Sequence, residues 1–337
     1  MSRRLRRFRR KALSALLALS ATLLLGTPAR AATGEADGAR AAFPAHFTAP
    51  YVGLWDPPGS LAAAGAAAGL RYFTLGFAIS DGSCHPALDG MPTEALPDWL
   101  AAVSRLRAAG GDVIVSFGGG GRELALDCAT VDSLKAAYRS VVDTFALTRI
   151  DLDIEGSTLE DQQANDRRNE ALAELRQEYG AAGHDLAVQY TLPVNPWGLS
   201  PDSLALLRSA QAHHLDVDVV NIMTMNYGDE LDMGAAATAA AAGLHSQLAQ
   251  IWPEKSAERL WAMEGNTPMI GVNGGGQEVF STDDASRLAA FAAEQGIRLL
   301  SFWSIGRDKA CAVEGTRSET CSGTTQSPYA FSRILGP

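Results

Sequence analysis

Residues 148–156 read Thr-Arg-Ile-Asp-Leu-Asp-Ile-Glu-Gly, a short stretch in which acidic and aliphatic side chains alternate. Successive side chains of a β-strand point to opposite faces, so Asp151, Asp153 and Glu155 share one face and the aliphatic residues share the other. An aliphatic face of this kind is typical of a strand that is covered by helices. The segment therefore predicts a buried strand that carries three carboxylates on its second face.

Seven further runs rich in β-branched and aromatic residues lie on either side of this stretch. The eight predicted strands are residues 51–55, 71–77, 112–117, 149–154, 186–192, 217–225, 268–272 and 298–303. Alanine- and leucine-rich stretches with helical spacing of apolar residues separate them, such as 96–109, 131–145 and 285–295. Two helix starts carry capping residues, Ser200 before Pro201 and Thr282 before two aspartates.

Eight strands that alternate with helices predict an α/β fold with a parallel sheet, and eight such units predict a closed (β/α)8 TIM barrel. An open doubly wound sheet would require a glycine-rich phosphate turn after the first strand, but residues 55–59 read Trp-Asp-Pro-Pro-Gly. No linker or second composition zone appears. We therefore expect a single barrel domain over residues 47–337, preceded by a short lead at 32–46, with no inserted α+β subdomain between strands seven and eight.

The first 31 residues have the features of a secretory signal. Six arginines and a lysine precede the apolar run from Ala12 to Leu25, and Ala29 and Ala31 supply small residues at the cleavage spacing. A membrane anchor is the alternative, but about 14 apolar residues are too few to cross roughly 30 Å of hydrocarbon. We expect cleavage after Ala31 and an extracellular location.

Net charge excludes some partners. The chain is 47% hydrophobic and 20% charged, which is typical of a globular protein. Removal of residues 1–31 takes away eight basic and no acidic groups, and leaves 20 basic against 38 acidic groups, a net charge of −18. Nucleic acid and anionic membranes repel such a chain, whereas a neutral sugar polymer is compatible with it. We expect a monomer.

Three carboxylates on one buried face suggest proton-transfer chemistry. Buried neighbouring carboxylates titrate as a coupled unit and can hold a proton near neutral pH. The first alternative is that the acidic residues form a turn exposed to solvent, and their alternation with aliphatic residues disfavours such a turn. A metal site is the second alternative, but no histidine or further acid is placed to complete one. The strand therefore predicts general acid chemistry at its carboxyl end.

The pattern Asp151-x-Asp153-x-Glu155 resembles the signature of family 18 glycoside hydrolases, the chitinases. The ending Asp-Ile-Glu-Gly is similar to a bacterial and archaeal subgroup. Other segments resemble further motifs of that family, namely Ser116-Phe117-Gly118-Gly119, Met225-Asn226-Tyr227 and Trp303. The resemblance extends from Tyr51 to Trp303 and implies a (β/α)8 enzyme without cofactor or metal that acts on chitin or N-acetylglucosamine oligosaccharides.

The resemblance also implies a mechanism. Glu155 is the expected general acid, and the substrate's own acetamido oxygen replaces the second carboxylate of the usual scheme as nucleophile, with net retention. Asp153 is expected to bind the acetamido N–H. Asp151 is expected to lie behind Asp153 and to share a proton with it, with Ser116 as its neighbour.

Substrate contacts follow from the same resemblance. Tyr227 is expected to donate its hydroxyl to the acetamido carbonyl, while Met223 and Met225 line the acetyl pocket and Trp303 forms the floor under the sugar. Two positions depart from the family. Thr148 stands where the wider motif begins with Asp. Gly228 stands where many members carry Asp, so the substrate contact from that position is expected to be either missing or supplied by Asn226 or Asp229.

The glycine run that starts at Gly118 and Gly119 lacks the Gly-Lys-Ser/Thr ending of a phosphate loop. We interpret it as backbone that approaches the neighbouring strand and the substrate closely. The missing subdomain between strands seven and eight predicts an open cleft and endo-type cleavage.

The four cysteines allow three pairings. In the predicted barrel, Cys84 and Cys128 follow neighbouring strands two and three, and Cys311 and Cys321 both follow strand eight. Because exported proteins form disulfides, we expect the pairs Cys84–Cys128 and Cys311–Cys321.

Two rival functions remain open. One is an endo-β-N-acetylglucosaminidase that acts on N-glycans by the same chemistry. The other is a non-hydrolytic sugar-binding barrel, which the presence of Glu155 disfavours.

Overall fold

The structure is a computed structural model that describes residues 42–228, 230–274 and 277–336. The predicted signal, residues 1–31, and most of the predicted lead at 32–46 lie outside the described residues, as does Asp229.

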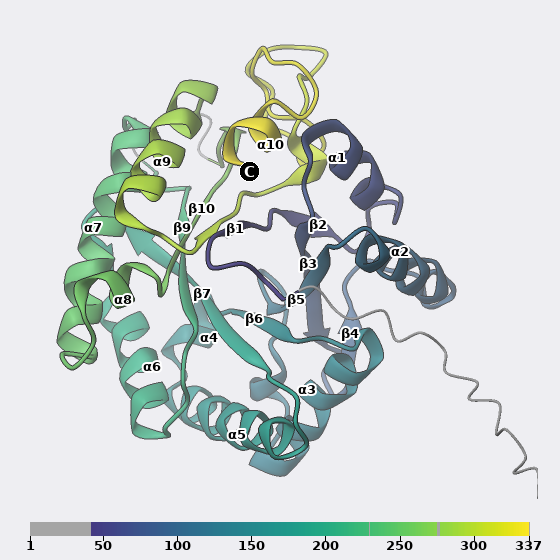
Figure 1. Ribbon diagram of the computed structural model, residues 1–337, viewed down its shortest axis with the longest axis vertical. Coiled ribbons are helices and arrows are strands. Elements are labelled where there is room, and N and C mark those ends of the chain that lie inside the picture. The colour runs from purple at the N-terminus through teal and green to yellow at the C-terminus, as the bar shows by residue number, and fades with distance from the viewer. Residues whose placement is uncertain (1–41, 229, 275–276, 337) are drawn as a thin grey trace, which may run out of the picture. The chain divides into compact units, whose positions relative to one another are not determined.

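A ring of parallel strands forms the centre of the fold (Figure 1). In chain order these strands are β1 (Phe47–Thr48), β2 (Tyr51–Gly53), β3 (Tyr72–Ser80), β5 (Asp112–Gly118), β6 (Arg149–Asp153), β7 (Ala187–Asn195), β9 (Val219–Thr224), β10 (Glu264–Pro268) and β13 (Leu299–Leu300). At one end of the sheet β13 pairs with β1, and at the other β3 pairs with β2. Only Ala49 and Pro50 separate β1 from β2, so one chain segment joins both ends and the barrel closes. The predicted (β/α)8 fold is confirmed.

Helices surround the ring. They are α1 (Ser60–Ala68), α2 (Leu96–Ala108), α3 (Val131–Phe145), α4 (Ser157–Glu160), α5 (Gln162–Ala181), α6 (Pro201–Ala212), α7 (Met233–Ile251), α8 (Ala257–Trp261), α9 (Thr282–Gln295) and α10 (Ala330–Leu335). Helix α3 shows why these segments are helical. Leu134, Tyr138, Val141 and Phe145 recur at helical spacing and are buried against the sheet. Thr130 caps its first turn in a reciprocal pair of hydrogen bonds with Ser133.

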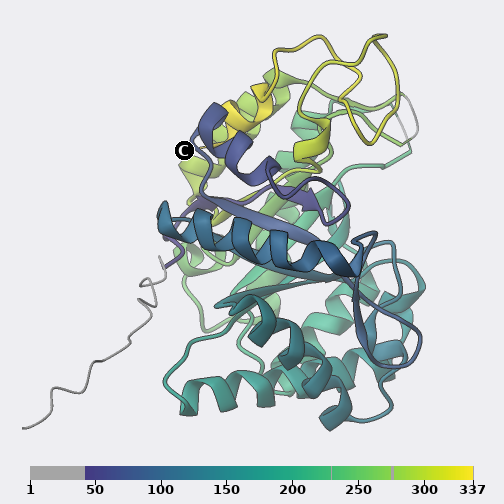
Figure 2. The same ribbon diagram turned by 90° about the vertical axis from the view of Figure 1, so that its right-hand side faces the viewer.

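Short elements extend the loops that follow the barrel strands. They are β4 (Pro86–Leu88), β8 (Gly198–Leu199), the hairpin of β11 (Gly271–Val272) and β12 (Val279–Phe280), and the 3-10 turns η1 (Thr93–Ala95), η2 (Leu124–Leu126) and η3 (Ile305–Arg307). Figure 2 shows the barrel from the side, with the long yellow loop before α10 extending beyond the strands. Between β10 and β13 the described chain holds the β11–β12 hairpin and α9 in place of an inserted subdomain.

Two sequence predictions about element positions are wrong. The seventh barrel strand is β10 (Glu264–Pro268), not residues 268–272, and Gly271 and Val272 belong to the hairpin. The strand was missed because its sequence, Glu-Gly-Asn-Thr-Pro, has none of the β-branched aliphatic residues that mark the other strands. Helix α9 is capped by Ser281 rather than Thr282, because the Ser281 hydroxyl accepts from the Asp284 N–H.

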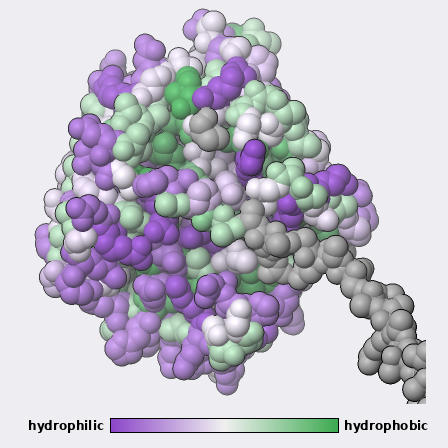
Figure 3. Space-filling view, in the orientation of Figure 1, coloured by the Kyte–Doolittle hydropathy of each residue, from purple (hydrophilic) through white to green (hydrophobic). Residues whose placement is uncertain are grey.

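Both predicted disulfides are present. Cys84 is bonded to Cys128, and Cys311 is bonded to Cys321. The first joins the loops after β3 and β5, which are neighbouring strands, and the second closes a loop after β13. Hydrophilic residues predominate over α5, α6 and α8 in Figure 3, as expected for helices whose other side covers a sheet. None of the helices in the described part of the chain is both long and apolar enough to cross a membrane.

Candidate active site

Strand β6 places the acidic residues on one face, as the alternation predicts. Asp151 is fully buried in the barrel interior and Asp153 is 4% exposed. Glu155 follows the end of β6 and is half-buried. Gly156, with a φ of +57°, then turns the chain into α4. The three carboxylates therefore step from the barrel interior toward its carboxyl-end mouth.

A cage of four donors surrounds the Asp151 carboxylate. Its Oδ2 accepts hydrogen bonds from the Ser116 hydroxyl at 2.5 Å and the Tyr51 hydroxyl at 2.9 Å. Its Oδ1 accepts from the Thr191 hydroxyl at 2.7 Å and the Gln189 amide at 3.1 Å. Burial raises the pKa of Asp151, and these hydrogen bonds oppose that rise by stabilising the charged form.

The Ser116 neighbour of Asp151 was predicted, whereas the other three cage residues were missed. Tyr51 and Asp151 are 100 residues apart, and a sequence does not give the register that brings them together. The alternation of side chains along a strand could have indicated two of them. Gln189 and Thr191 lie two residues apart on β7 and so point to the same face.

Asp153 has no comparable partners. Its Oδ1 atom is buried and has no hydrogen-bond partner within the described residues. Burial raises its pKa well above the ordinary range, and the nearby charges of Glu155 and Asp151 add to the rise. The Asp151–Asp153 hydrogen bond that a shared proton requires does not occur among the described contacts, so proton sharing stays a prediction.

Burial also raises the pKa of Glu155. A glutamic acid with a raised pKa stays protonated at a higher pH than one in water, which is the state that a general acid needs. The site thus contains one half-buried acid above a buried carboxyl with a free oxygen.

A cavity of about 630 Å³ opens above these residues. Most of the predicted site side chains line it, namely Asp153, Glu155, Met223, Met225, Asn226, Tyr227 and Trp303. Asp151 and Ser116 lie beneath this layer, buried in the barrel. The only charged residues that line it, within the described chain, are Asp153 and Glu155.

Gly118 and Gly119 allow a close approach between backbones. A Cβ atom on Gly118 would lie 2.3 Å from the Asp153 carbonyl oxygen, and one on Gly119 would lie 2.8 Å from the Phe77 ring. The Gly119 N–H donates to the Asp153 carbonyl at 3.0 Å. The predicted close approach to the neighbouring strand is confirmed, and the approach to the substrate stays a prediction.

Tyr227 and Asn226 follow β9 and are held by the β11–β12 hairpin. The Asn226 Oδ1 accepts from the Gly274 N–H at 2.7 Å, so this predicted binding residue also holds the loop in place. The Tyr227 hydroxyl is buried and has no partner within the described residues. Burial and the negative charge of Glu278 raise the Tyr227 pKa, which keeps the hydroxyl a hydrogen-bond donor.

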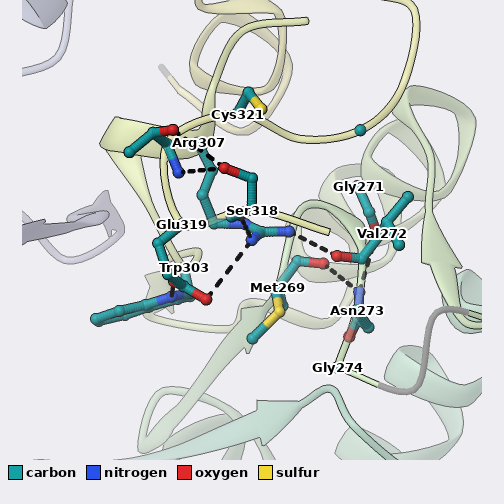
Figure 4. Close-up of polar contacts among 12 residues, drawn as sticks. Met269, Gly271, Val272, Asn273, Gly274, Trp303, Arg307, Ser318, Glu319 and Cys321 are labelled. Carbon is teal, nitrogen blue, oxygen red and sulfur yellow. Dashed lines mark hydrogen bonds and ion pairs between the residues drawn. The ribbon is translucent and has the colours of Figure 1, made fainter. Parts of the chain in front are cut away.

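Trp303 lies in a group of aromatic side chains. Its ring is stacked on Phe77 at 5.8 Å between centroids, and Tyr51 and Trp55 lie at 5.7 and 6.2 Å. Figure 4 shows the indole N–H directed at Glu319, whose Oε2 accepts at 3.0 Å. The indole is therefore fixed both by ring packing and by the loop that Cys311–Cys321 closes.

Buried Arg307 anchors that loop (Figure 4). Its guanidinium donates to the carbonyls of Ile270 and Val272 at 3.0 and 2.7 Å. It also donates to the Ser318 carbonyl, next to Glu319. The arginine thus joins the β11 segment to the loop that holds Trp303.

No group of three or more histidine, cysteine, aspartate or glutamate side chains in the described chain is arranged to hold a metal ion.

Comparison with known proteins gives the family. A structure of the catalytic domain of a hyperthermophilic chitinase from Pyrococcus furiosus is 34% identical, with a TM-score of 0.79, over 88% of this chain and 95% of that one. The chain belongs to the family 18 chitinases. No family model matches it.

Two curated chitinases are also similar to the chain. A "Probable bifunctional chitinase/lysozyme" of Escherichia coli (strain K12) is 37% identical in an alignment of 317 positions that covers 88% of this chain and 35% of that protein. "Endochitinase 11" of Metarhizium anisopliae is 36% identical in an alignment of 294 positions that covers 83% of this chain and 56% of that protein. The chain thus spans between about one third and about half of these chitinases.

Proposed function

We propose that the protein is a secreted chitinase that hydrolyses the β-1,4 linkages of N-acetylglucosamine polymers. The observation that supports this most is that Glu155 lines one cavity together with Trp303 and Asp153, whose Oδ1 has no hydrogen-bond partner within the described residues. Family membership adds support, since a related domain from Pyrococcus furiosus has been solved in complex with chito-oligosaccharides.

Glu155 acts as the general acid in this proposal. Its carboxyl proton goes to the glycosidic oxygen as the bond from that oxygen to the anomeric carbon breaks. The acetamido carbonyl oxygen of the same sugar attacks the anomeric carbon and forms an oxazolinium ring. Water then attacks that carbon and gives its proton to the Glu155 carboxylate, so the anomeric configuration is retained and the acid is restored.

Asp153 and Tyr227 hold the acetamido group. The free Asp153 Oδ1 accepts the acetamido N–H and offsets the positive charge that develops on the oxazolinium ring. The unpartnered Tyr227 hydroxyl donates to the acetamido carbonyl. Asp151, fixed by its four donors, stabilises this arrangement from below.

Apolar side chains complete the subsite. Met223 and Met225 pack against the acetyl methyl group, and Trp303 presents its ring to the C–H face of the sugar. Asn226 supplies the polar contact to the substrate that Gly228, which has no side chain, does not make.

Endo-type cleavage by a monomer fits the same geometry. The described chain between β10 and β13 adds only a short hairpin and a helix beside the cavity, so a long polymer meets no tall wall on that side. The signal-like residues 1–31 and the net charge of −18 that remains after them support export and a neutral polymeric substrate.

A parallel digestion tests the proposed function. The protein is incubated with a chitin hexamer and with an N-glycosylated protein, and the products are followed by mass spectrometry and by proton NMR of the newly formed anomers. We expect hexamer cleavage at internal linkages with the β-anomer formed first. Release of glycans without hexamer cleavage would favour the N-glycan rival, and an initial α-anomer would exclude the retaining mechanism.

A further inference from the structure

One aromatic side chain of the cavity is unusually exposed. Trp197 is 74% exposed, the most of any large hydrophobic residue in the described chain, yet it lines the same cavity as Glu155. It lies at the turn between β7 and β8. An exposed indole at the rim of a binding cavity has an unused apolar face, which is a common feature of recognition sites.

The turn that carries Trp197 is held rigidly against α7. The Leu199 N–H donates to the Gln247 Oε1 at 2.8 Å, and the Gln247 amide donates back to the Leu199 carbonyl at 3.1 Å. Gly243 of α7 lies so close that a Cβ atom there would be 2.3 Å from the Trp197 carbonyl oxygen. The backbone of Trp197 is therefore fixed at the rim of the cavity.

Barrel topology places Trp197 across the mouth from a second exposed tryptophan. Trp55 is 45% exposed, follows β2 and contacts Trp303. In the order of the eight barrel strands around the ring, β2 is the first and β7 is the fifth. The loops that follow these two strands therefore face each other across the mouth of the barrel. Glu155 and Trp303, at the fourth and eighth strands, lie between them.

The wall near Trp197 is mostly apolar and has no charged side chain. Pro193, Val194 and Pro196 line the cavity beside it together with the neutral polar residue Asn195, and within the described residues the charged groups of the lining are only Asp153 and Glu155. Such a surface suits a neutral ring with C–H faces rather than an ionic ligand.

We propose that Trp197 is a stacking platform for a sugar ring of the same polymer, beyond the ring that lies on Trp303. This inference rests on the proposed chitinase function and adds a subsite to it. The bound chain then crosses the mouth from the Trp55 side to the Trp197 side, with its scissile linkage at Glu155.

The test compares Trp197→Ala and Trp197→Phe with the wild type on N-acetylglucosamine oligomers from dimer to hexamer. We expect Trp197→Ala to lower kcat/KM about tenfold on the longest oligomers and to change it little on the shortest. Trp197→Phe keeps a flat ring and is expected to restore most of the loss. Val313→Ala, which truncates a residue that is 69% exposed outside the cavity, is the matched control.

Calorimetric binding of the hexamer to the same variants tests the Trp197 platform separately from the chitinase function. If the wild type cleaves no oligomer, the chitinase proposal fails, while weaker hexamer binding by Trp197→Ala still supports the platform. An equal loss at every oligomer length, or no loss in binding and in kcat/KM on the hexamer, overturns the platform. Because Trp197 is exposed, an unchanged thermal midpoint is expected and excludes misfolding as the cause.

Discussion

Asp153 lies between two other carboxylates and is buried more deeply than Glu155. Burial raises the Glu155 pKa, whereas burial and the charges of Glu155 and Asp151 together raise the Asp153 pKa well above the ordinary range, so Glu155 loses its proton before Asp153 does. A general acid works only while protonated, so activity is lost as pH rises through its pKa.

Asp153→Asn is therefore expected to leave the alkaline limb of kcat/KM against pH in place, because a neutral amide replaces a carboxyl that is still protonated when Glu155 ionises. The rate at the optimum falls, because an amide cannot become a carboxylate as positive charge develops on the oxazolinium ring. The measurement is kcat/KM on a soluble oligomer from pH 4 to 10. A limb that moves down by about one unit would show that Asp153 is charged while Glu155 still holds its proton.

Glu264 is a buried acid away from the cavity, and it makes stability depend on pH. It is fully buried at the start of β10, and burial raises its pKa to about 10. Its Oε1 lies 3.2 Å from the His245 Nδ1, and burial lowers the pKa of that histidine. Near neutral pH both members of the pair are therefore uncharged.

The sign of this effect follows from proton counts. In the unfolded chain Glu264 loses its proton near a pKa of about 4.3, while the folded chain keeps it until about 10. Between these values the unfolded state binds fewer protons, so the contribution of Glu264 to stability falls as pH rises. Glu264→Gln copies the protonated form and is expected to exceed the wild type in stability at pH 9 and to match it near pH 4. Urea unfolding at both pH values measures this, and exposed Glu294→Gln is the control. Equal pH slopes for wild type and Glu264→Gln would contradict it.

At the scale of elements, a buried ion pair joins the loop after β5 to α5. Arg168 donates to the Glu123 Oε2 at 2.8 Å, and both side chains are at most 1% exposed. Tyr138 of α3 donates to the other Glu123 oxygen at 2.6 Å. Arg168 also donates to the Asn165 side-chain oxygen, and the Asn165 amide donates to the Leu159 carbonyl. Leu159 belongs to α4, the short helix that follows Glu155. The network thus supports the segment that carries the proposed acid.

Arg168→Met is expected to be strongly destabilising. It leaves the Glu123 carboxylate buried without its cation, which costs about 3–5 kcal/mol of the free energy of unfolding. Arg139→Met breaks a partly exposed ion pair with Glu178 and should cost about 1 kcal/mol or less. Denaturant unfolding of both variants makes the comparison. Similar losses for the two would show that the buried pair has no special role.

Sequence patterns located most elements because most barrel strands are apolar and most helices are amphipathic. The predicted helix at 131–145 coincides with α3, whose buried residues recur at helical spacing. Strand β10 was missed because its residues are buried polar groups, such as Asn266 and Thr267, that are satisfied by neighbouring strands and helices. Polar satisfaction of this kind depends on tertiary pairing and leaves no periodic signal.

For the whole molecule, closure of the barrel explains both what the sequence predicted and what it did not. Cys84 and Cys128 follow consecutive strands of the predicted barrel, whose loops are neighbours, so their pairing could be predicted from the order of the strands. The donor cage of Asp151 depends on side chains from β2, β5 and β7 that meet only in the closed ring. The family motifs predicted the lining residues that belong to them, such as Glu155 and Tyr227. The exposed position of Trp197 at the cavity is seen only in the structure.

The central claim is that Glu155 supplies the proton that cleaves a sugar linkage. The most direct test measures turnover and binding of a chitin hexamer by Glu155→Gln, with exposed Glu160→Gln on α4 as the matched control. We expect Glu155→Gln to lose at least about 10²-fold in kcat while its affinity for the hexamer, measured by calorimetry, stays near that of the wild type. Glu160→Gln should retain both. A Glu155→Gln variant that still cleaves the hexamer at the wild-type rate would contradict the account.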